Sequence, residues 1–480
     1  MDENYPVHYI IHKNNKVHGL TKMEKDDIDI PAGTRLLIIP DAGTNDSKQC
    51  NLLIDCGIDV IVLDHHEAED IASNNKAIIV NNQMSNDYTC KAFSGVGIAY
   101  EFAKALDDTY VCDLANKYLD LVAFGNISDV MDIRDYQTRY YINQGIVNIS
   151  NKFLQALNKA QEFSTKGEIN IHNISWYWTP IVNSMIRIGS YEDRDLLFRA
   201  FIETDEVFPY KKRGCAEIIN EDIYTRAARL CKNIKSKQDS MRNDACDELI
   251  AEIDPNDKVA VVVVDDVDSG IIGLSCMKIA DTINKPCMVL REYEDGKLGG
   301  SCRNCRNSIV DNFKDLVVDT GLFSLVAGHN NAFGVEIDVN NLEAAKEALN
   351  AALASIEIDN TTYCDFLLWE SDVDYQFVKE IDDSKWLYGA GLEEPIVVIE
   401  GIPVSSDACF VMGENNDSIS FISNGIKYCK FKCNNTDELL RFVNECDETM
   451  YINVVGKCSI NNYKGNITAQ ITIEDYEVAS

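Results

Sequence analysis

Two adjacent histidines stand at the end of an apolar run, where their side chains can do chemistry. Asp64, His65 and His66 follow the apolar residues 58–63. Because neighbouring side chains of an extended chain point to opposite sides, both imidazoles cannot enter the same core. Imidazole and carboxylate ligands together suit a divalent transition metal such as Mn²⁺. The alternative is that these polar residues only cap a loop or helix after the strand.

Two further carboxylates can join this group. Asp41 ends the apolar run 35–41, and Asp129 lies on a loop after an expected helix at 113–124. Three carboxylates and two imidazoles suffice for two metal ions about 3.5–4 Å apart, the arrangement that clamps a phosphoryl group during displacement. The residue types therefore favour a metal centre that acts on phosphate, with strand-end capping as the alternative.

The elements that must carry these residues are short apolar runs. Residues 35–41, 58–66 and 77–81 are rich in β-branched side chains, which indicates strands buried on both faces, as in parallel sheets. Helical segments alternate with such strands, for instance at 96–106 and 113–121. This alternation predicts a doubly wound α/β domain, in which ligands gather at the carboxyl ends of the strands.

The remaining chain predicts three further regions. A helical connector is expected after the first domain, with a long exposed helix over 221–250. A second, smaller α/β domain is expected next, with strands at 258–266 and 286–291 and helices at 270–283 and 341–355. Short alternating strands then predict a small β-barrel or sandwich, for instance at 395–400, 417–423 and 451–459. The expected domains are 1–190, 191–252, 253–356 and 360–480.

Composition narrows the class of protein. The net charge of −34 repels a polyanion, which argues against a protein that coats duplex nucleic acid without specificity. It does not exclude an enzyme whose basic residues gather in one cleft. The chain carries 17 cysteines and begins with no secretory signal, so we expect reduced cytoplasmic thiols, with Cys302-Cys305 and Cys429-Cys433 as bystanders. No stretch is apolar enough to span a membrane.

Ordered motifs along nearly the whole chain resemble those of the DHH superfamily, in particular RecJ-type single-strand nucleases. The segments that carry the resemblance are PDAGTND at 40–46, VLDHHE at 62–67, SGVGIAYEF at 94–102, LVAFGNISDVMDIR at 121–134, PIVNSMIRIGS at 180–190, GSCRN at 300–304, AGHNNAFG at 327–334, WLYGAGLEEP at 386–395 and VVGKCSINNYKGNITAQITIED at 454–475.

The resemblance implies a DHH phosphoesterase domain, a DHH-associated substrate-binding domain and an OB-like C-terminal β-barrel. It implies a metal-dependent exonuclease that degrades single-stranded DNA from the 5′ end, with two Mn²⁺ or Mg²⁺ ions, in replication, recombination or repair. Single-strand-binding or replication proteins are the expected partners. The resemblance assigns metal binding to Asp41, His65, His66 and Asp129, with Asp64 as a ligand or as the residue that orients a histidine, and substrate contact to Arg139, Asn183, Arg187, Ser301, Arg303, Asn304 and His329.

Further candidates are weaker. In the C-terminal region, single-stranded DNA can be contacted by Tyr451, Tyr463 and Lys464. OB-like barrels stack bases on aromatic side chains and hold the DNA backbone with basic ones. Aromatic side chains of a small barrel are, however, more often part of its core. His18 stands where the family carries another polar loop.

The chain departs from the family at one point. RecJ-type domains begin with a strand ending in Asp-x-Asp-x-x-Gly, and none precedes Asp41; the acidic residues 26–29 follow a polar run and precede Pro31. Three explanations are open: the natural start lies further upstream, the strand comes from another polypeptide, or the chain is an inactive relative. A catalytically incomplete scaffold and a phosphodiesterase for short oligonucleotides therefore remain alternative functions.

Overall fold

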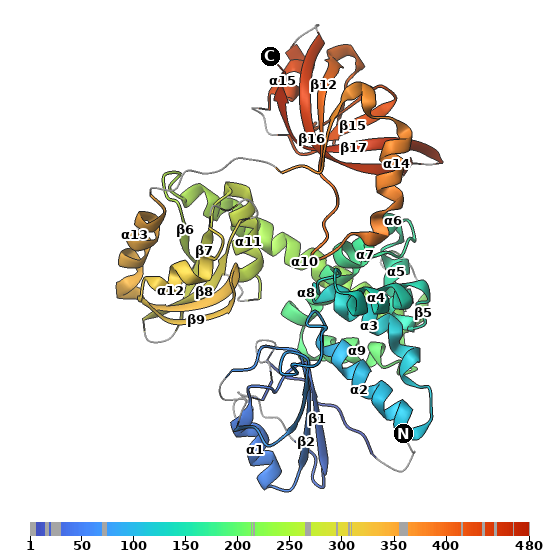
Figure 1. The fold of residues 1–480 in the computed structure, drawn as a ribbon, viewed down its shortest axis with the longest axis vertical. Helices are drawn as coiled ribbons and strands as arrows, with labels where there is room; N and C mark the ends of the chain where they lie inside the picture. The colour runs from blue at the N-terminus through green and yellow to red at the C-terminus, as the bar shows by residue number, and fades with distance from the viewer. Residues whose placement is uncertain are drawn as a thin grey trace. The chain divides into compact units, whose positions relative to one another are not determined.

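Segments that are far apart in the sequence fold together in two units (Figure 1). The first unit comprises Met1–Arg35, Ser150–Gly167 and Tyr177–Thr361, and the second comprises Leu36–Ile149, Glu168–Trp176 and Thr362–Ser480. Each unit is described by itself. The computed structural model describes residues 6–14, 19–20, 30–69, 74–212, 214, 217–264, 270–293, 296–305, 308, 310–354, 363–413, 416–433, 437–445, 449–463 and 465–479.

A parallel sheet brings the polar strand ends of the second unit to one edge. Strands β1 (Leu36–Pro40), β2 (Asp59–Asp64) and β3 (Ile78–Asn81) pair in the order β1-β2-β3. Pro40 lies opposite Leu63, and Asp64 lies opposite Asn81. The three predicted apolar runs are thus confirmed as parallel strands, and their carboxyl ends meet where ligands gather in such sheets.

Helices α1 (Ser47–Asp55) and α2 (Gly95–Tyr110) both contact β2. Ile61 and Leu63 pack into a hydrophobic cluster with Phe93 and Ile98, on the side of α2. Val62 is fully buried and touches the loop at Gly43, which leads into α1. Because successive side chains of a strand point to opposite faces, β2 is covered on both, which explains its continuous apolar sequence.

The helix expected at 113–124 is only partly confirmed. A short 3-10 turn, η3 (Ala115–Tyr118), comes first, and the α-helix α3 runs Leu119–Ser128. Helix α4 (Tyr136–Val147) packs closely on α3, since a Cβ on Gly145 would lie 2.2 Å from the carbonyl oxygen of Leu119. Asp135 begins α4 as its N-cap, accepting hydrogen bonds from two backbone N–H groups.

The first unit contains the long helix that the sequence predicts, α10 (Ile223–Glu252). The expectation that this helix is exposed is wrong for one face: Ile223, Ala227 and Cys231 are fully buried, because they form an i, i+4, i+8 stripe. Helices α5 and α8 contact α10. This part of the first unit consists of α5 (Lys152–Ala160), α6 (Glu162–Thr165), α8 (Thr179–Ile188), α9 (Tyr191–Phe201), α10 and the hairpin of β4 (Val207–Lys211) and β5 (Ile218–Asp222).

The second α/β region is confirmed within the first unit as a five-stranded mixed sheet in the order β6-β7-β8-β10-β9. Only β6 and β7 run parallel, and the other pairs are antiparallel. Its elements are β6 (Ala260–Val264), α11 (Ile272–Ile283), β7 (Cys287–Tyr293), β8 (Lys297–Arg303), α12 (Phe313–Asp319), β9 (Phe323–His329), β10 (Ala332–Asp338) and α13 (Leu342–Leu353).

The C-terminal strands form a seven-stranded sheet in the order β11-β12-β16-β17-β15-β14-β13, seen in orange and red in Figure 1. Among the described residues no strand pair joins β11 to β13, so the expected closed barrel is not confirmed. The elements are β11 (Phe366–Trp369), α14 (Tyr375–Asp383), η7 (Lys385–Leu387), β12 (Val397–Ser405), β13 (Phe410–Met412), β14 (Ser418–Ser423), β15 (Ile426–Lys430), α15 (Glu438–Glu445), β16 (Thr449–Tyr463) and β17 (Asn466–Val478).

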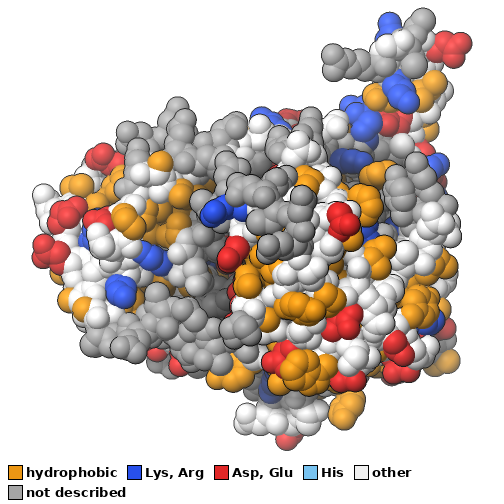
Figure 2. Space-filling model, turned by 90° about the horizontal axis from the view of Figure 1, so that it is seen from above, with side chains coloured by type: hydrophobic (Ala, Val, Ile, Leu, Met, Phe, Trp, Pro, Cys, Tyr) orange, Lys and Arg blue, Asp and Glu red, His pale blue; other side chains and the backbone are white. Residues whose placement is uncertain are grey.

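The surface side chains and the cysteines can be compared with the predictions made from the composition. Acidic, basic and hydrophobic side chains are interspersed over the coloured atoms of the face in Figure 2. Cys302, Cys305, Cys429 and Cys433 are buried free thiols. Within the part of the chain that the structure describes, no helix combines the length and apolar character needed to cross a membrane. The predicted domain boundaries do not follow the division into units and stay a prediction.

Candidate metal centre

Asp41 leaves β1 in a backbone conformation that is unusual for a residue with a side chain. Its φ is 60°, in the left-handed region, and its N–H donates to the carbonyl oxygen of Leu63 over 2.8 Å. A Cβ added to Gly95 would lie 2.4 Å from Asp41 Oδ1. The Asp41 carboxylate therefore rests on the first turn of α2, where the helix dipole favours negative charge.

Asp64 is buried, and its oxygens are occupied by neighbouring donors. Only 3% of its side chain is exposed. Oδ2 accepts from the N–H of Thr44, while Oδ1 accepts from the N–H groups of His65 and His66 and lies 2.7 Å from His66 Nδ1. Burial by itself raises the pKa of Asp64, but the hydrogen bonds from His66 and Thr44 outweigh it and hold that pKa well below its usual value. Asp64 is thus an ionised carboxylate that holds the His66 ring.

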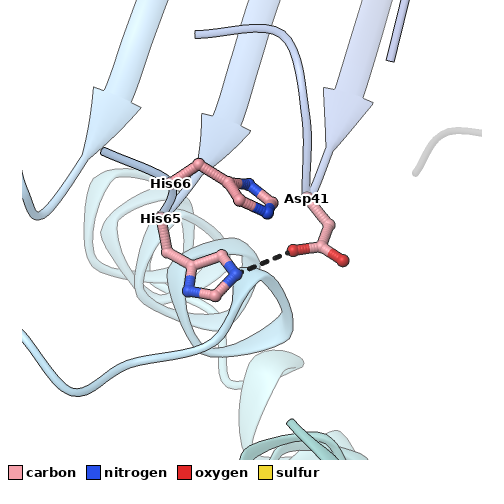
Figure 3. Close-up of side chains that lie close together, drawn as sticks. All are labelled: Asp41, His65 and His66. Carbon is pink, nitrogen blue, oxygen red and sulfur yellow. Dashed lines mark ion pairs between the residues drawn. The ribbon is translucent and has the colours of Figure 1, made fainter. Parts of the chain in front are cut away.

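The two imidazoles converge on Asp41 (Figure 3). His65 Nε2 lies 3.1 Å from Asp41 Oδ1. One ligand atom from each of Asp41, His65 and His66 lies within 4.8 Å of the others, and no second such group occurs among the described residues. The hydrogen bond with Asp64 is the main cause that raises the pKa of His66. The charges of Asp64, Asp41 and Asp129 raise it further, while burial lowers it.

Asp129 completes the group from another element. It follows directly after α3 and donates its N–H to the carbonyl oxygen of Gly125 over 2.9 Å. Its Oδ2 lies 3.4 Å from His65 Nε2. The side chains of Asp129 and Asp41 are 49% and 56% exposed, so both carboxylates can meet a ligand from solvent. The structure therefore brings together all five predicted residues of the centre.

This donor set fits a divalent ion. Ligands about 2.1 Å from an octahedral ion lie about 3 Å from their neighbours, and the distances of 3.1 Å and 3.4 Å from His65 Nε2 to the two carboxylates match that spacing. Two imidazoles with carboxylates suit a transition metal such as Mn²⁺. When bound, such an ion supplies positive charge to phosphate oxygens.

Residues that the motifs did not single out build the scaffold. Asn81, at the end of β3, donates to the Thr44 hydroxyl and to the carbonyl oxygen of His66, both over 2.9 Å. Asn126 is fully buried, and its Oδ1 accepts from both the N–H and the hydroxyl of Ser94. Asn126 thereby ties the start of α2, under Asp41, to the last turn of α3, before Asp129. The signal for Asn81 in the sequence was its position at a strand end, and Asn126 and Ser94 lie within the motif segments at 121–134 and 94–102.

Three predicted substrate residues of the first unit, Ser301, Arg303 and His329, share one face of its sheet. Arg303, Ala332 and His329 are register partners on β8, β10 and β9, so their side chains point to the same face, as does Ser301. Arg303 Nη2 would lie 2.9 Å from a Cβ on Gly273, at the start of α11. Glycine at residue 273 therefore lets the Arg303 guanidinium lie against the first turn of α11.

Other predicted substrate residues have varied surroundings. Desolvation lowers the pKa of Arg187, and the charge of Arg303 lowers it further. Asn183 lies one turn earlier on α8. Asn304 Nδ2 instead donates to the carbonyl oxygen of Val310 and to Asn331 Oδ1. Arg139, in the second unit, donates from Nε to the carbonyl oxygen of Ile133, so both residues also have a structural role.

The remaining candidates are Tyr451 and a group that lies outside the described residues. Tyr451 is 55% exposed on β16. His18, residues 26–29, Lys464 and the side chain of Tyr463 lie outside the described residues.

Comparison with known proteins decides the family. Residues 2–126 match the model for the N-terminal domain of the DHH family. The chain is 35% identical over 483 residues to YorK of Bacillus subtilis, provisionally named as an SPbeta prophage-derived single-strand DNA-specific exonuclease, covering 98% of this chain and 82% of YorK. The chain is a RecJ-type member of the DHH family. The RecJ of Bacillus subtilis, a single-stranded-DNA-specific exonuclease, is 24% identical over 66% of this chain and 38% of RecJ.

Solved structures agree with this family. The structure of RecJ from Thermus thermophilus in complex with Mn²⁺ superposes with a TM-score of 0.72 at 18% identity and covers 93% of the chain, which spans 62% of that RecJ. The Mg²⁺ complex of the same protein gives a TM-score of 0.66. The mixed α/β fold with parallel strands is therefore a RecJ-type fold.

Proposed function

We propose that this RecJ-type chain hydrolyses phosphodiester bonds of single-stranded DNA with bound Mn²⁺ or Mg²⁺, acting as an exonuclease from the 5′ end. The observation that carries the proposal is the convergence of Asp41, His65 and His66, at the carboxyl ends of parallel strands, with Asp129, at the end of α3. The relatives named as single-strand DNA-specific exonucleases support the substrate. The ligand set supports divalent metal, and two ions are our proposal for their number.

Each residue of the centre has a separate role in this proposal. Asp41 and Asp129 supply accessible carboxylates on either side of His65. Asp64 fixes the ring of His66 through Nδ1, so that Nε2 is the nitrogen available to an ion. With ions in place, the charge that develops on the scissile phosphate is stabilised by fixed positive charge.

The basic face of the first unit supports recognition of the phosphate backbone. Arg187 and Arg303 lie near enough for one charge to lower the pKa of the other, and this repulsion is relieved when a phosphate anion binds between or beside them. A guanidinium can hold two phosphate oxygens at once. We assign contact with the phosphates of the DNA strand to Arg303, His329 and Ser301. Arg187 and Asn183 are further contacts with the DNA in this proposal.

The C-terminal sheet supports handling of a single strand in the same proposal. The exposed ring of Tyr451 on β16 can stack on a base, and an OB-like barrel is the finer description that we propose for this sheet. Arg139 and Asn304 contribute to the substrate site through the loops that they hold.

The test is nucleotide release from long single-stranded DNA in Mn²⁺, with the label at either the 5′ or the 3′ end. We expect release from the 5′ label first, no release after His65→Ala with His66→Ala, and full release from Asp59→Asn. Asp59 is an exposed carboxylate at the start of β2 and serves as the matched control. Release by the double variant equal to that of the wild type would contradict the proposed centre.

Two alternatives give different results in the same assay. A phosphodiesterase for short oligonucleotides releases nucleotides from dinucleotides faster than from long strands. A catalytically incomplete scaffold releases none, and it binds no Mn²⁺ at the centre. The centre built from Asp41, His65, His66 and Asp129 favours the enzyme over the scaffold.

A further inference from the structure

A tight turn between η7 and β12 is docked on the loop that follows Asp129. The turn Gly389–Leu392 closes on itself, with Gly389 N–H donating to Leu392 O over 2.8 Å and Leu392 N–H donating to Gly389 O over 3.1 Å. Ile133 donates its N–H to the carbonyl oxygen of Ala390 over 2.9 Å. A segment some 260 residues later in the chain therefore holds the loop at 129–134 by its backbone.

Both glycines of this turn are needed for the close approach. Gly391 has a φ of +81°, and a Cβ on it would lie 2.1 Å from Asp132 Oδ1 and 3.0 Å from Arg134 Nε. Asp132 and Arg134 form an ion pair of 2.6 Å beside it. A Cβ on Gly389 would lie 2.9 Å from Ile133 Cδ1. A side chain at residue 391 must therefore displace the Asp132 carboxylate, and one at residue 389 must displace the end of the Ile133 side chain.

The held loop carries the metal ligand Asp129 between two fixed points. One fixed point is the end of α3, where the N–H of Asp129 bonds to the carbonyl oxygen of Gly125. The other is Ile133, whose side chain is 2% exposed and whose carbonyl oxygen accepts from Arg139 Nε over 2.8 Å. Between them, Val130 has a left-handed φ of 56°. A shift of Ile133 therefore has only three intervening residues in which to be absorbed before it moves Asp129.

We propose that the turn Gly389–Leu392 is a positioning element for the metal ligand Asp129. By holding Ile133 and the Asp132–Arg134 pair, it sets the distance from the Asp129 carboxylate to His65, which is 3.4 Å. The affinity of the centre for metal then depends on how the segment before β12 is seated. This inference rests on the proposed function of the centre, and it adds residues that are neither ligands nor substrate contacts.

The test measures Mn²⁺ binding by the full chain, from the electron paramagnetic resonance signal of free Mn²⁺. Removing a residue that positions a metal ligand commonly weakens affinity 10–100-fold, and we expect that range for Gly391→Ala. Gly389→Ala is expected to give a smaller loss, because its Cβ meets only the flexible ends of Ile133 and Ile171. The matched control is Gly425→Ala, which has a φ of +76° but no atom within 4 Å of its Cβ.

The control separates positioning from backbone strain. Alanine at residues 391 and 425 is forced into the same left-handed conformation, so both variants lose stability for the same reason. Only Gly391→Ala also displaces Asp132. We therefore expect similar melting temperatures for the two variants, unchanged Mn²⁺ affinity for Gly425→Ala, and an altered spectrum of the bound Mn²⁺ in Gly391→Ala alone. Adding Asp132→Ala to Gly391→Ala removes the clashing carboxylate and should restore part of the affinity.

Each outcome decides between the two proposals. Equal affinity of the wild type and a folded Gly391→Ala would overturn the positioning role and leave the metal centre standing. An equal loss in Gly425→Ala would also overturn it, since strain alone would then explain the effect. If Gly391→Ala does not fold, Gly389→Ala decides, and unchanged affinity there overturns the inference. No Mn²⁺ binding by the wild type would overturn the proposed function itself.

Discussion

Asp64 Oδ1 lies 2.7 Å from His66 Nδ1, so a buried carboxylate holds the ring of the histidine two positions later. Asp64 can do this because the backbone N–H groups of Thr44, His65 and His66 stabilise its charge in a site that is 3% exposed. A carboxylate that fixes the second nitrogen of a metal-binding histidine sets both its tautomer and its direction. The aspartate of the Asp-His-His triplet thus orients its second histidine.

Replacing Asp64 with asparagine tests this relationship. Asp64→Asn keeps the shape of the side chain but removes its charge, and its NH2 group meets at least one of the four donors, so the His66 ring is held more weakly. We expect a 10–100-fold loss of Mn²⁺ affinity together with a loss of about 1–3 kcal/mol in the free energy of unfolding. Isothermal titration and thermal melting measure the two effects. Asp59→Asn, an exposed carboxylate at the other end of β2, should change neither, and unchanged affinity in Asp64→Asn would refute the role.

A second prediction concerns Gly95, which lies against the metal ligand Asp41. A Cβ there would lie 2.4 Å from Asp41 Oδ1 and 2.6 Å from Asp41 Cβ, so Gly95→Ala must displace the Asp41 carboxylate. We expect weaker Mn²⁺ binding and slower nucleotide release, with α2 still formed because alanine favours helix. Gly57→Ala is the control, since its φ of +84° costs stability but no atom lies within 4 Å of its Cβ. The prediction fails if both variants bind Mn²⁺ alike.

The strand ends of the centre could be predicted from the sequence because their signal is local. Continuous apolar runs indicate strands buried on both faces, and each run here ends at a residue of the centre or its scaffold: Asp41, Asp64 and Asn81. Parallel pairing then places those ends together. The contact between Asn81 and Thr44 joins residues 37 positions apart, and no periodicity in the sequence encodes such a hydrogen bond.

The C-terminal region shows a different limit. Alternating side chains predict strands such as β12 and β17, which have one buried face, but alternation does not specify which strand pairs with which. The order β11-β12-β16-β17-β15-β14-β13 places strands side by side that are far apart in the chain. Helix α10 was predicted by its length and charge, whereas its buried stripe of Ile223, Ala227 and Cys231 is made largely of small residues with little apolar signal.

Replacing Arg303 should weaken the binding of DNA and leave the binding of metal unchanged. If Arg303 holds a backbone phosphate, Arg303→Ala should raise the KM for single-stranded DNA more than it lowers kcat, with Mn²⁺ affinity unaltered. Each phosphate that the variant no longer neutralises should reduce the slope of log affinity against log salt by about 0.7 for a single strand. Binding to a labelled oligonucleotide at several salt concentrations measures this slope. Lys297→Ala is the control. It removes a positive charge from the same β-strand, β8, where Lys297 pairs with Glu336, and it should leave the slope unchanged.

Glu394 gives a prediction about pH and stability. Burial raises the pKa of Glu394 above its ordinary value of 4.5; the charge of Lys457 opposes this, and those of Glu474 and Asp382 reinforce it. The folded chain therefore holds the proton more tightly than the unfolded chain, and ionisation of Glu394 at neutral pH opposes folding. We expect Glu394→Gln to melt at a higher temperature than the wild type at pH 7.5, with the gain disappearing as the pH falls to about 4.5, where the unfolded carboxyl is itself protonated.

The neighbouring exposed glutamate provides the comparison for Glu394. Glu393→Gln makes the same chemical change one residue earlier, at an exposed side chain, and should leave the melting temperature nearly constant across this range. Thermal unfolding followed by circular dichroism at half-unit steps of pH measures both variants. A gain for Glu394→Gln that is equal at pH 4.5 and pH 7.5 would mean that packing of the amide, and not removal of a buried charge, stabilises the variant.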